Sequence, residues 1–347
     1  MNRRNFLAAS AAAATLTNVT AAATATARSA KGVKVIIPAT PPAELAELES
    51  AAPGVELVQC RSEDEAAEHA AGADACYGFI SRRVLRAGKS LKWVQQPSAG
   101  VEHLIEIPEL VESDIVLTNM QRAYGPEIAD QALAYLLAFT RGLTHFVRSQ
   151  PSQEWSSRQP GVVLDELMGK TLLVIGLGGI GCEIARRAAA FGMRVLATDP
   201  KVWERPLFVD ELHKPDQFHS LLPRANVVAS AVPLTKASRK MIGTKEFRMM
   251  KPGVILINVS RGGVVDTDAL VSALDSKQVA AAGLDVTDPE PLPKGHPLWS
   301  RNVIITPHTA GQSPGGERRR HEIFRENVRR FAAGEMLLNV VDKKAGY

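Results

Sequence analysis

The sequence predicts an α/β protein with two doubly wound parallel sheets. Short apolar strands alternate with helical segments twice along the chain, from residue 33 to 120 and again from residue 170 to 308. This alternation indicates parallel strands joined by helical crossovers. With 347 residues, the chain is long enough for two domains that each bury a hydrophobic core.

The first thirty residues have the pattern of an export signal. A pair of arginines, Arg3 and Arg4, precedes Phe6, an Ala-rich apolar stretch follows, and small residues at Ala25–Ala27 suit a cleavage site. The pattern resembles a twin-arginine signal peptide, which the export machinery reads as an address. We therefore expect a signal peptide at residues 1–27 and a periplasmic or otherwise exported protein. We expect no stable membrane insertion, because the apolar stretch is shorter than the roughly 20 residues that span a bilayer. The alternatives are an Ala-rich tail without a targeting role, a misplaced start codon and an uncleaved anchor.

Charge and cysteine content argue against a nucleic-acid partner and against a bound metal. The formal net charge is only +4, and the densest basic run, at residues 317–330, alternates with acidic and apolar residues at helical spacing. We interpret that run as a solvated helix face and expect no nucleic-acid partner. Cys60, Cys76 and Cys182 form no Cys-x-x-Cys pair and no cluster with metal-ligand spacing, so we expect no metal. Two buried thiols at Cys60 and Cys76 are the favoured interpretation, and a disulfide between them is the alternative.

In the first alternating series, five apolar segments are predicted strands. The helix expected after the first strand has Pro42 early, Leu45 and Leu48 three residues apart, and a Pro-Gly stop. A second helix is rich in Ala and Glu. The predicted strands lie within residues 33–39, 55–60, 75–80, 91–104 and 115–120.

A long amphipathic helix, predicted over residues 125–150, links this series to the second one. Pro126 suits its first turn, and Glu127 complements the N-terminal dipole. A final helix, at about residues 314–334, is expected to return to the first domain. Six further strands are predicted between these helices, at residues 171–176, 194–199, 226–232, 254–260, 279–286 and 302–308.

A glycine-rich turn follows the first strand of the second series. The G-x-G-x-x-G segment runs through Gly176, Gly178, Gly179, Ile180 and Gly181. Its glycines permit a tight turn, and the free N–H groups of the next helix suit a pyrophosphate. Asp199 ends the next strand, where a carboxylate binds ribose hydroxyls and repels a 2′-phosphate, so we expect NAD rather than NADP. A glycine turn without a nucleotide is the alternative.

Polar residues follow the later strands of the same series. Arg261 comes just after one strand, Asp285 and Glu290 follow the next, and His308 ends the last. Because the carboxyl ends of parallel strands face the ligand crevice, these side chains could assemble around a small acid. Taken singly, Arg261 could cap a strand end, Glu290 could lie in a loop, and His308 could satisfy a backbone carbonyl.

With these motifs in this order, the chain resembles the D-isomer-specific 2-hydroxyacid dehydrogenase family. The resemblance spans about residues 32–340 and rests on the glycine turn, "NVSRGGVVD", "GLDVTDPEPLP" and "TPHTAG". It implies an NAD-dependent oxidoreductase that interconverts a D-2-hydroxy acid and its 2-keto acid, similar to glyoxylate and hydroxypyruvate reductases. It also implies a homodimer. A flavodoxin-like substrate domain is expected at residues 28–122, completed by 313–347, with a Rossmann NAD-binding domain inserted at 123–312.

The resemblance also implies roles for individual residues. Arg261 would bind the substrate carboxylate, His308 would be the general acid and base, and Glu290 would pair with the imidazole. Asp285 would bind the nicotinamide carboxamide, and Trp155 matches a recurrent tryptophan. Further cofactor-lining residues would be Val232, Pro233, Ser238 and Val259, and backbone N–H groups near Ala99 and Gly100 would hold the substrate carboxylate.

Substrate choice stays open among glyoxylate, hydroxypyruvate, pyruvate-like and bulkier 2-keto acids. One departure from the family is Asp130–Gln131, where relatives often have Glu–His. A non-catalytic NAD-binding sensor on the same fold is the main alternative function. Formate or phosphite oxidation is a further one, although Glu290 disfavours the formate type, whose members typically carry Gln there.

Overall fold

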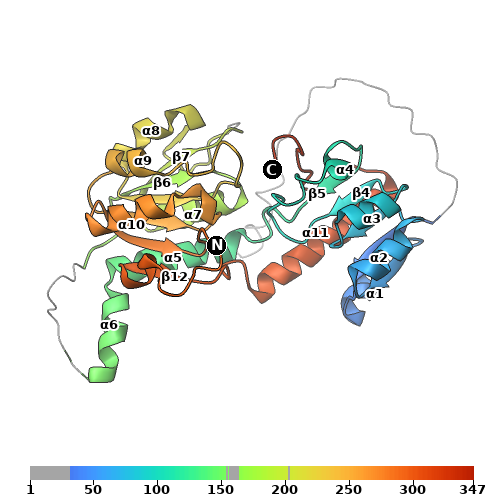
Figure 1. The fold of residues 1–347 in the computed structure, drawn as a ribbon, viewed down its shortest axis with the longest axis horizontal. Helices are drawn as coiled ribbons and strands as arrows, with labels where there is room; N and C mark the ends of the chain where they lie inside the picture. Colours follow the sequence, from blue (N-terminus) through green and yellow to red (C-terminus); the bar gives the residue numbers. More distant parts are fainter. Residues whose placement is uncertain (1–31, 154, 156–163, 202–203) are drawn as a thin grey trace, which may run out of the picture. The chain divides into compact units, whose positions relative to one another are not determined.

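Two sheets, both wholly parallel, organise the chain in the computed structural model (Figure 1). The structure describes residues 32–153, 155, 164–201 and 204–347. The predicted signal peptide at residues 1–27 lies outside these ranges. The fold class predicted from the alternating pattern is confirmed, while the domain boundaries at residues 122 and 313 stay predictions.

The first sheet has five strands in the order β2-β1-β3-β4-β5, which is the flavodoxin-like doubly wound order. Val35, Ile36 and Ile37 of β1 are completely buried. A continuous apolar run of this kind is typical of a parallel strand covered on both faces. All five strands lie where the sequence predicts them: β1 (Lys34–Pro38), β2 (Glu56–Cys60), β3 (Ala75–Tyr77), β4 (Trp93–Gln95) and β5 (Val116–Thr118).

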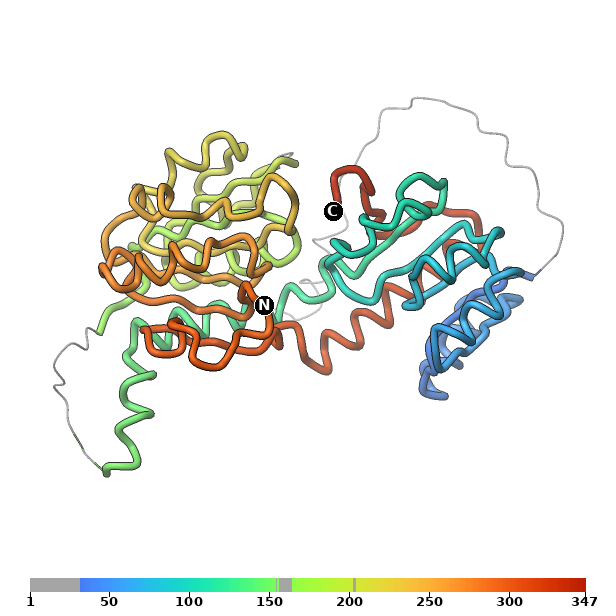
Figure 2. Tube along the Cα trace, viewed as in Figure 1, coloured from blue at the N-terminus to red at the C-terminus, as the bar shows by residue number. Residues whose placement is uncertain are grey.

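The C-terminal helix packs against this first sheet. Phe324 and Val328 of α11 share a buried cluster with Val35 and Ile37, and the Phe324 ring stacks on Tyr77 with 4.2 Å between centroids. In Figure 2 the orange-red helix α11 accordingly runs toward the blue N-terminal elements, and α11 contacts α1. The predicted return of this helix is therefore confirmed. The helices associated with the first sheet are α1 (Pro42–Ala51), α2 (Glu63–Ala70), α3 (Arg82–Ala87), α4 (Pro108–Val111) and α11 (Pro314–Ala333).

The second sheet has seven strands in the order β12-β11-β10-β9-β6-β7-β8, with the strand order reversing between β6 and β9. Six of the strands are the predicted ones. The seventh, β8, was not predicted, because this short edge strand is only half-buried and lacks an apolar run. The strands are β6 (Thr171–Ile175), β7 (Arg194–Thr198), β8 (Glu211–His213), β9 (Val227–Ser230), β10 (Val254–Asn258), β11 (Val279–Leu284) and β12 (Val303–Ile305).

Separate hydrophobic clusters cover the two faces of this sheet. Leu173 of β6 belongs to one cluster, whereas its neighbours Leu172 and Val174 belong to the other, as strand alternation requires. The α-helices here are α5 (Gly125–Thr140), α6 (Leu143–Ser149), α7 (Gly179–Ala190), α8 (Phe218–Leu221), α9 (Thr244–Met249) and α10 (Thr267–Asp275). Short 3-10 helices are η2 (Gln150–Ser152), η3 (Pro215–Gln217), η4 (Leu222–Arg224), η5 (Gly262–Val264) and η6 (Pro297–Ser300).

The predicted single helix over residues 125–150 is wrong, because it breaks at Gly142. This glycine has φ 64°, in the left-handed region, so α5 ends before it and α6 begins after it. Glycine adopts this conformation without the steric cost that a Cβ would impose. Within the described ranges, no helix is both long and apolar enough to cross a membrane.

The three cysteines are free thiols, so a disulfide between Cys60 and Cys76 is excluded. Both side chains are buried in the first domain's core. Burial raises the pKa of the Cys76 thiol to about 12. Such a thiol is inert near neutral pH, which agrees with a packing role for this residue.

Candidate active site

The glycine-rich turn between β6 and α7 can accept a dinucleotide. Gly176 has φ 89°, and a Cβ on Gly181 would lie 1.9 Å from the carbonyl oxygen of Gly176. These two positions therefore require glycine for the turn itself. Gly178 differs, because a Cβ there would have no heavy atom within 4 Å. This open space adjoins the uncapped N-terminus of α7, whose free N–H groups suit a pyrophosphate.

Asp199 lies beside this turn at the end of β7. Its Oδ2 atom accepts a hydrogen bond from the Leu177 amide, and its Oδ1 atom accepts one from the Lys201 amide, each at 2.8 Å. The carboxylate thus ties the glycine turn to the strand end. Each carboxylate oxygen can accept a second hydrogen bond, which leaves room for the ribose hydroxyls of a cofactor.

The segment after β9 packs against the same turn. A Cβ on Gly176 would lie 2.9 Å from Cγ1 of Val232, so the two segments are in close contact. The Ser238 hydroxyl donates a hydrogen bond to the Pro233 carbonyl at 2.6 Å and thereby closes the loop that carries both residues. Val259, also predicted to line the cofactor, is buried in the hydrophobic core of this domain.

His308 and Glu290 are brought together from two different loops. The Nδ1 atom of His308 lies 2.7 Å from Oε1 of Glu290, and both side chains are nearly half exposed. Among the described residues, no partner contacts Nε2 of His308. This second nitrogen is therefore available to exchange a proton with a ligand.

Asp285 holds the backbone that carries His308. Its buried carboxylate accepts hydrogen bonds from the Thr306 hydroxyl at 2.6 Å, from the Thr309 amide at 2.9 Å and from the Ala310 amide. The Thr306 hydroxyl also hydrogen-bonds to the hydroxyl of Tyr135 on α5. Burial is the largest effect on Tyr135 and raises its pKa, so the phenol stays protonated near neutral pH. The contact of Asp285 with a nicotinamide carboxamide stays a prediction.

Arg261 contacts the predicted substrate loop. A Cβ on Gly100 would lie 1.8 Å from Nη2 of Arg261, which places the guanidinium against the Gly100 backbone. Nε of Arg261 lies 3.0 Å from Oε1 of Glu102, and Nη1 donates to the Ser260 carbonyl at 2.8 Å. The loop is itself anchored, because the Ala99 carbonyl accepts a hydrogen bond from the Asn119 side chain at 2.7 Å.

Sequence reasoning missed Glu102, Thr306 and Tyr135. The signal for Glu102 was present, since an acidic residue stands two positions after Gly100 in the same loop. Thr306 also stands in the "TPH" motif that carries His308. Tyr135 offered no local signal, because it occupies an apolar position of α5. The predicted Trp155 is fully exposed.

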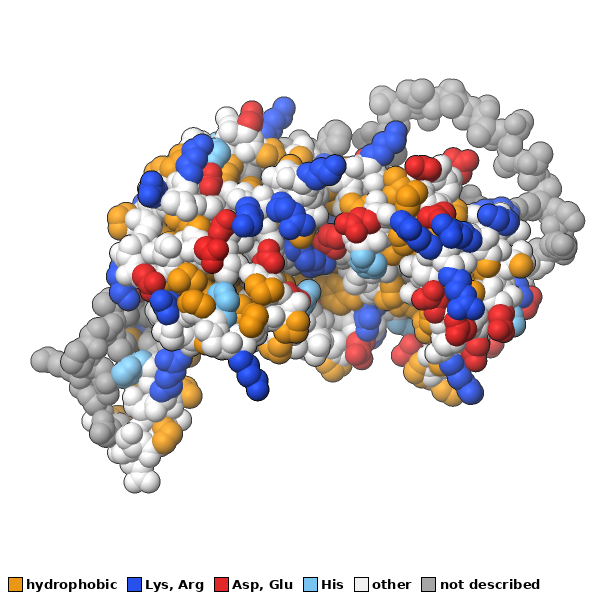
Figure 3. Space-filling view, viewed as in Figure 1, with side chains coloured by type: hydrophobic (Ala, Val, Ile, Leu, Met, Phe, Trp, Pro, Cys, Tyr) orange, Lys and Arg blue, Asp and Glu red, His pale blue; other side chains and the backbone are white. Residues whose placement is uncertain are grey.

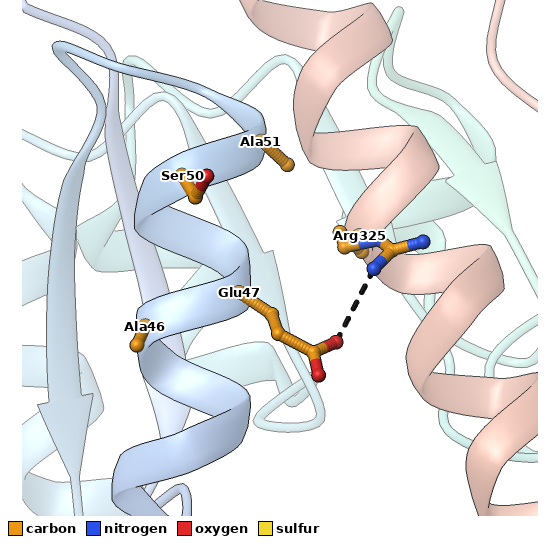
Figure 4. A pocket seen from close by; sticks show the side chains of 5 residues that line it. All are labelled: Ala46, Glu47, Ser50, Ala51 and Arg325. Carbon is orange, nitrogen blue, oxygen red and sulfur yellow. Dashed lines mark hydrogen bonds and ion pairs between the residues drawn. The ribbon is translucent and has the colours of Figure 1, made fainter.

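A separate cavity of about 460 Å³ lies between α1 and α11 (Figure 4). Its lining includes Glu47 and Arg325, whose carboxylate oxygen and Nη1 are 3.2 Å apart. Glu47 also pairs with His321 at 3.0 Å. The cavity's charges thus neutralise one another, and none of the predicted site residues lines it, so it is distinct from the candidate active site.

The described residues contain no group of three or more His, Cys, Asp or Glu side chains that could hold a metal ion. On the face shown in Figure 3, basic and acidic side chains are interspersed. Together with the small net charge, this mixed distribution favours no large polyanionic partner on that face.

Comparison with known proteins decides the family. A family described as "D-isomer specific 2-hydroxyacid dehydrogenase, NAD binding domain" matches residues 133–310. The chain belongs to this family. It is 34% identical over 275 residues to a glyoxylate reductase of Thermococcus litoralis, covering 76% of this chain and 81% of that one. It is 33% identical over 243 residues to a hydroxypyruvate reductase of Thermotoga maritima, covering 69% and 77%.

Two further members of the family extend the comparison. A D-3-phosphoglycerate dehydrogenase of Methanocaldococcus jannaschii is 33% identical over 265 residues, which are 76% of this chain but only 50% of that protein. The solved D-isomer specific 2-hydroxyacid dehydrogenase of Xanthobacter autotrophicus, in complex with NADPH and MES, has a TM-score of 0.78 at 28% identity. That match covers 91% of this chain and 99% of the other.

Family membership shows that this protein is an oxidoreductase. The 2-hydroxyacid dehydrogenases act on the CH–OH group of hydroxy acids with a nicotinamide dinucleotide as cofactor. The open cradle at Gly178 and the free N–H groups of α7 fit such a cofactor.

Proposed function

We propose that this protein interconverts a small 2-keto acid and the corresponding D-2-hydroxy acid with NAD as cofactor. The observation that carries the proposal is the contact between His308 and Glu290, which leaves Nε2 of the imidazole available. A binding protein without catalysis has no need of a histidine held by a carboxylate at a strand end. The intact set of Arg261, Glu290 and His308 therefore favours an enzyme over a sensor.

His308 handles the proton in this mechanism. A nicotinamide dinucleotide held at the glycine turn would supply the hydride for the keto carbon, and the negative charge that this leaves on the carbonyl oxygen would need a proton. Protonated His308 donates from Nε2 to that oxygen, and in the oxidation direction the neutral imidazole removes the hydroxyl proton. Glu290 accepts a hydrogen bond from Nδ1–H and thereby holds the ring, so that Nε2 is the nitrogen that exchanges the proton.

Arg261 orients the substrate through its carboxylate. Its planar fork can bind a carboxylate with two parallel hydrogen bonds. The Ser260 carbonyl and Glu102 engage Nη1 and Nε, while Nη2 lies against Gly100. A substrate carboxylate bound there meets both the guanidinium and the backbone N–H groups near Ala99 and Gly100.

Asp199 supports NAD rather than NADP as the cofactor. A 2′-phosphate would meet a carboxylate that two backbone amides hold in place. We expect the protein to bind NADH at least tenfold more tightly than NADPH, since an uncompensated like-charge contact costs on the order of 1–2 kcal/mol. Titration of each cofactor, with Asp199→Ala reducing the preference, tests this assignment.

Glyoxylate and hydroxypyruvate are the proposed substrate class. Two relatives are a glyoxylate reductase and a hydroxypyruvate reductase, and the match covers most of each of them. The decisive experiment follows NADH absorbance while the protein meets a panel of 2-keto acids. Turnover that disappears in His308→Ala but persists in His103→Ala, at an exposed histidine of the substrate loop, supports the proposal. Tight NADH binding without turnover on any keto acid would favour the sensor instead.

Export and dimerisation complete the proposal. The arginine pair and the small residues at 25–27 support transport by the twin-arginine machinery, which carries folded proteins. A protein that folds around its cofactor before export would keep NAD where free NAD is scarce. Cell fractionation tests the location, and recovery only from the cytoplasm would contradict it. Sedimentation tests the homodimer, which a monomer at micromolar concentration would contradict.

A further inference from the structure

Arg122 lies against the first turn of α7, where the cofactor's pyrophosphate is expected. A Cβ on Gly179 would lie 2.8 Å from both Cα and Cγ of Arg122. Contact this close is possible only because Gly179 has no side chain. The turn before α5 and the glycine-rich turn are therefore packed backbone to backbone. Gly125 repeats the contact, since a Cβ there would lie 2.9 Å from the Gly179 carbonyl oxygen.

The Arg122 side chain is exposed and available to a ligand. Within the described ranges of the chain, its guanidinium has no hydrogen bond and no ion pair. Glu183, the acidic residue of α7 closest to this turn, is already paired with Arg186 at 2.5 Å and with Arg187. The positive charge of Arg122 is therefore not neutralised by its acidic neighbour on α7.

The charge of Arg122 acts on the start of α7. Burial raises the pKa of the Cys182 thiol, the nearby Arg122 charge opposes that rise, and the smaller effects of Asp199 and Glu183 add to it. The backbone amide of Cys182 bonds to the Gly178 carbonyl, so this thiol belongs to the same first turns of the helix. A positive charge that reaches Cys182 adds to the positive end of the helix dipole, and the two together favour an anion at this place.

We propose that Arg122 is a cofactor-binding residue that pairs with the pyrophosphate of the dinucleotide. The N–H groups of α7 would bind the phosphate oxygens from one side, and the guanidinium of Arg122 from another. This inference rests on the proposed function, because it uses the same cofactor at the same glycine turn. A guanidinium suits the task, since its fork binds two phosphate oxygens at once. Gly179 then keeps Arg122 in place as well as forming part of the glycine turn, because a side chain at residue 179 would displace Arg122.

Calorimetric titration of the full protein with NADH and with ADP-ribose tests the proposal. ADP-ribose retains the pyrophosphate but lacks nicotinamide, so its binding reports this contact apart from any catalysis. We expect Arg122→Gln to weaken both ligands by about 10- to 100-fold, as for loss of a charged hydrogen bond. Arg122→Lys should recover part of the affinity, because it keeps the charge without the fork. The dependence of affinity on salt should also become shallower in Arg122→Gln.

Arg148→Gln is the matched control, because this arginine is also exposed and lies on α6, outside the glycine turn. Its affinities should equal those of the unaltered protein. Gly179→Ala should weaken the binding of ADP-ribose as Arg122→Gln does. An unchanged melting temperature of Arg122→Gln would confirm that this variant keeps its fold. Equal affinities of Arg122→Gln and the unaltered protein would overturn the inference. Failure of the unaltered protein to bind either ligand would instead contradict the proposed function.

Discussion

Glu102 and Arg261 form an ion pair across two segments far apart in the sequence, with Oε1 and Nε 3.0 Å apart. Glu102 pairs with Nε of the guanidinium, while Nη2 lies against the Gly100 backbone, where the substrate carboxylate is expected. Glu102 is in this sense a positioning residue for Arg261. With Arg261 in its proposed role, the pairing would hold the guanidinium in a defined orientation before substrate arrives.

Removal of the Glu102 carboxylate should weaken substrate binding more than it slows turnover. We expect Glu102→Gln to raise KM for the keto acid by about tenfold, with kcat changed by less than threefold, because the guanidinium loses its fixed orientation. Steady-state kinetics at saturating NADH measures both constants. Glu106→Gln, at an exposed position of the same segment, should leave them unchanged. An unaltered KM in Glu102→Gln would show that Arg261 is held by other contacts.

Loss of the Asp285 carboxylate should destabilise the folded protein. This buried group accepts hydrogen bonds from Thr306, Thr309 and Ala310. In Asp285→Asn the amide must turn at least one N–H toward a donor, so we expect a loss of about 1–3 kcal/mol in the free energy of unfolding. Urea denaturation measures the change. Asp288→Asn, in the loop before Glu290, is the control, and a loss equal to that of Asp285→Asn would contradict the assignment.

Alanine substitutions at two glycines of the same turn should affect different properties, stability in one variant and cofactor affinity in the other. In Gly181→Ala the Cβ would meet the Gly176 carbonyl at 1.9 Å, so we expect at least about 2 kcal/mol of destabilisation. In Gly178→Ala the methyl group faces open space, so the free energy of unfolding should lie within about 0.5 kcal/mol of that of the unaltered protein. This variant should nevertheless bind NADH at least tenfold more weakly, because the methyl group enters the cradle. Full NADH affinity in Gly178→Ala would place the cofactor elsewhere.

Glu211 should make stability depend on pH under acidic conditions. Hydrogen bonds from Arg224 and then His213 lower its pKa from 4.5 to about 2. Because the folded-state pKa lies below the unfolded value, the stabilisation is present above pH 4.5 and disappears as the pH falls toward 2. We expect Glu211→Gln to be less stable at pH 7, with the difference closing between pH 4.5 and 2. Denaturation at each pH measures it, and a constant difference would exclude this linkage.

The sequence by itself determined the elements with strong local patterns. Apolar runs bounded by turn residues located eleven of the twelve strands found among the described residues, and the strand–glycine–helix pattern located the expected cofactor turn. The order of Arg261, Glu290 and His308 after successive strands predicted which sheet edge carries them. Each of these signals is local, because it depends on residues close together in the chain.

Only the tertiary structure decided the features that depend on distant partners. β8 exists because it pairs with β7, and the helix after Gly125 ends early because Gly142 turns left-handed. The contact of Glu102 with Arg261, and that of Arg122 with Gly179, join segments separated by more than fifty residues. No local periodicity encodes such contacts, since they form only once the helices and strands have packed together.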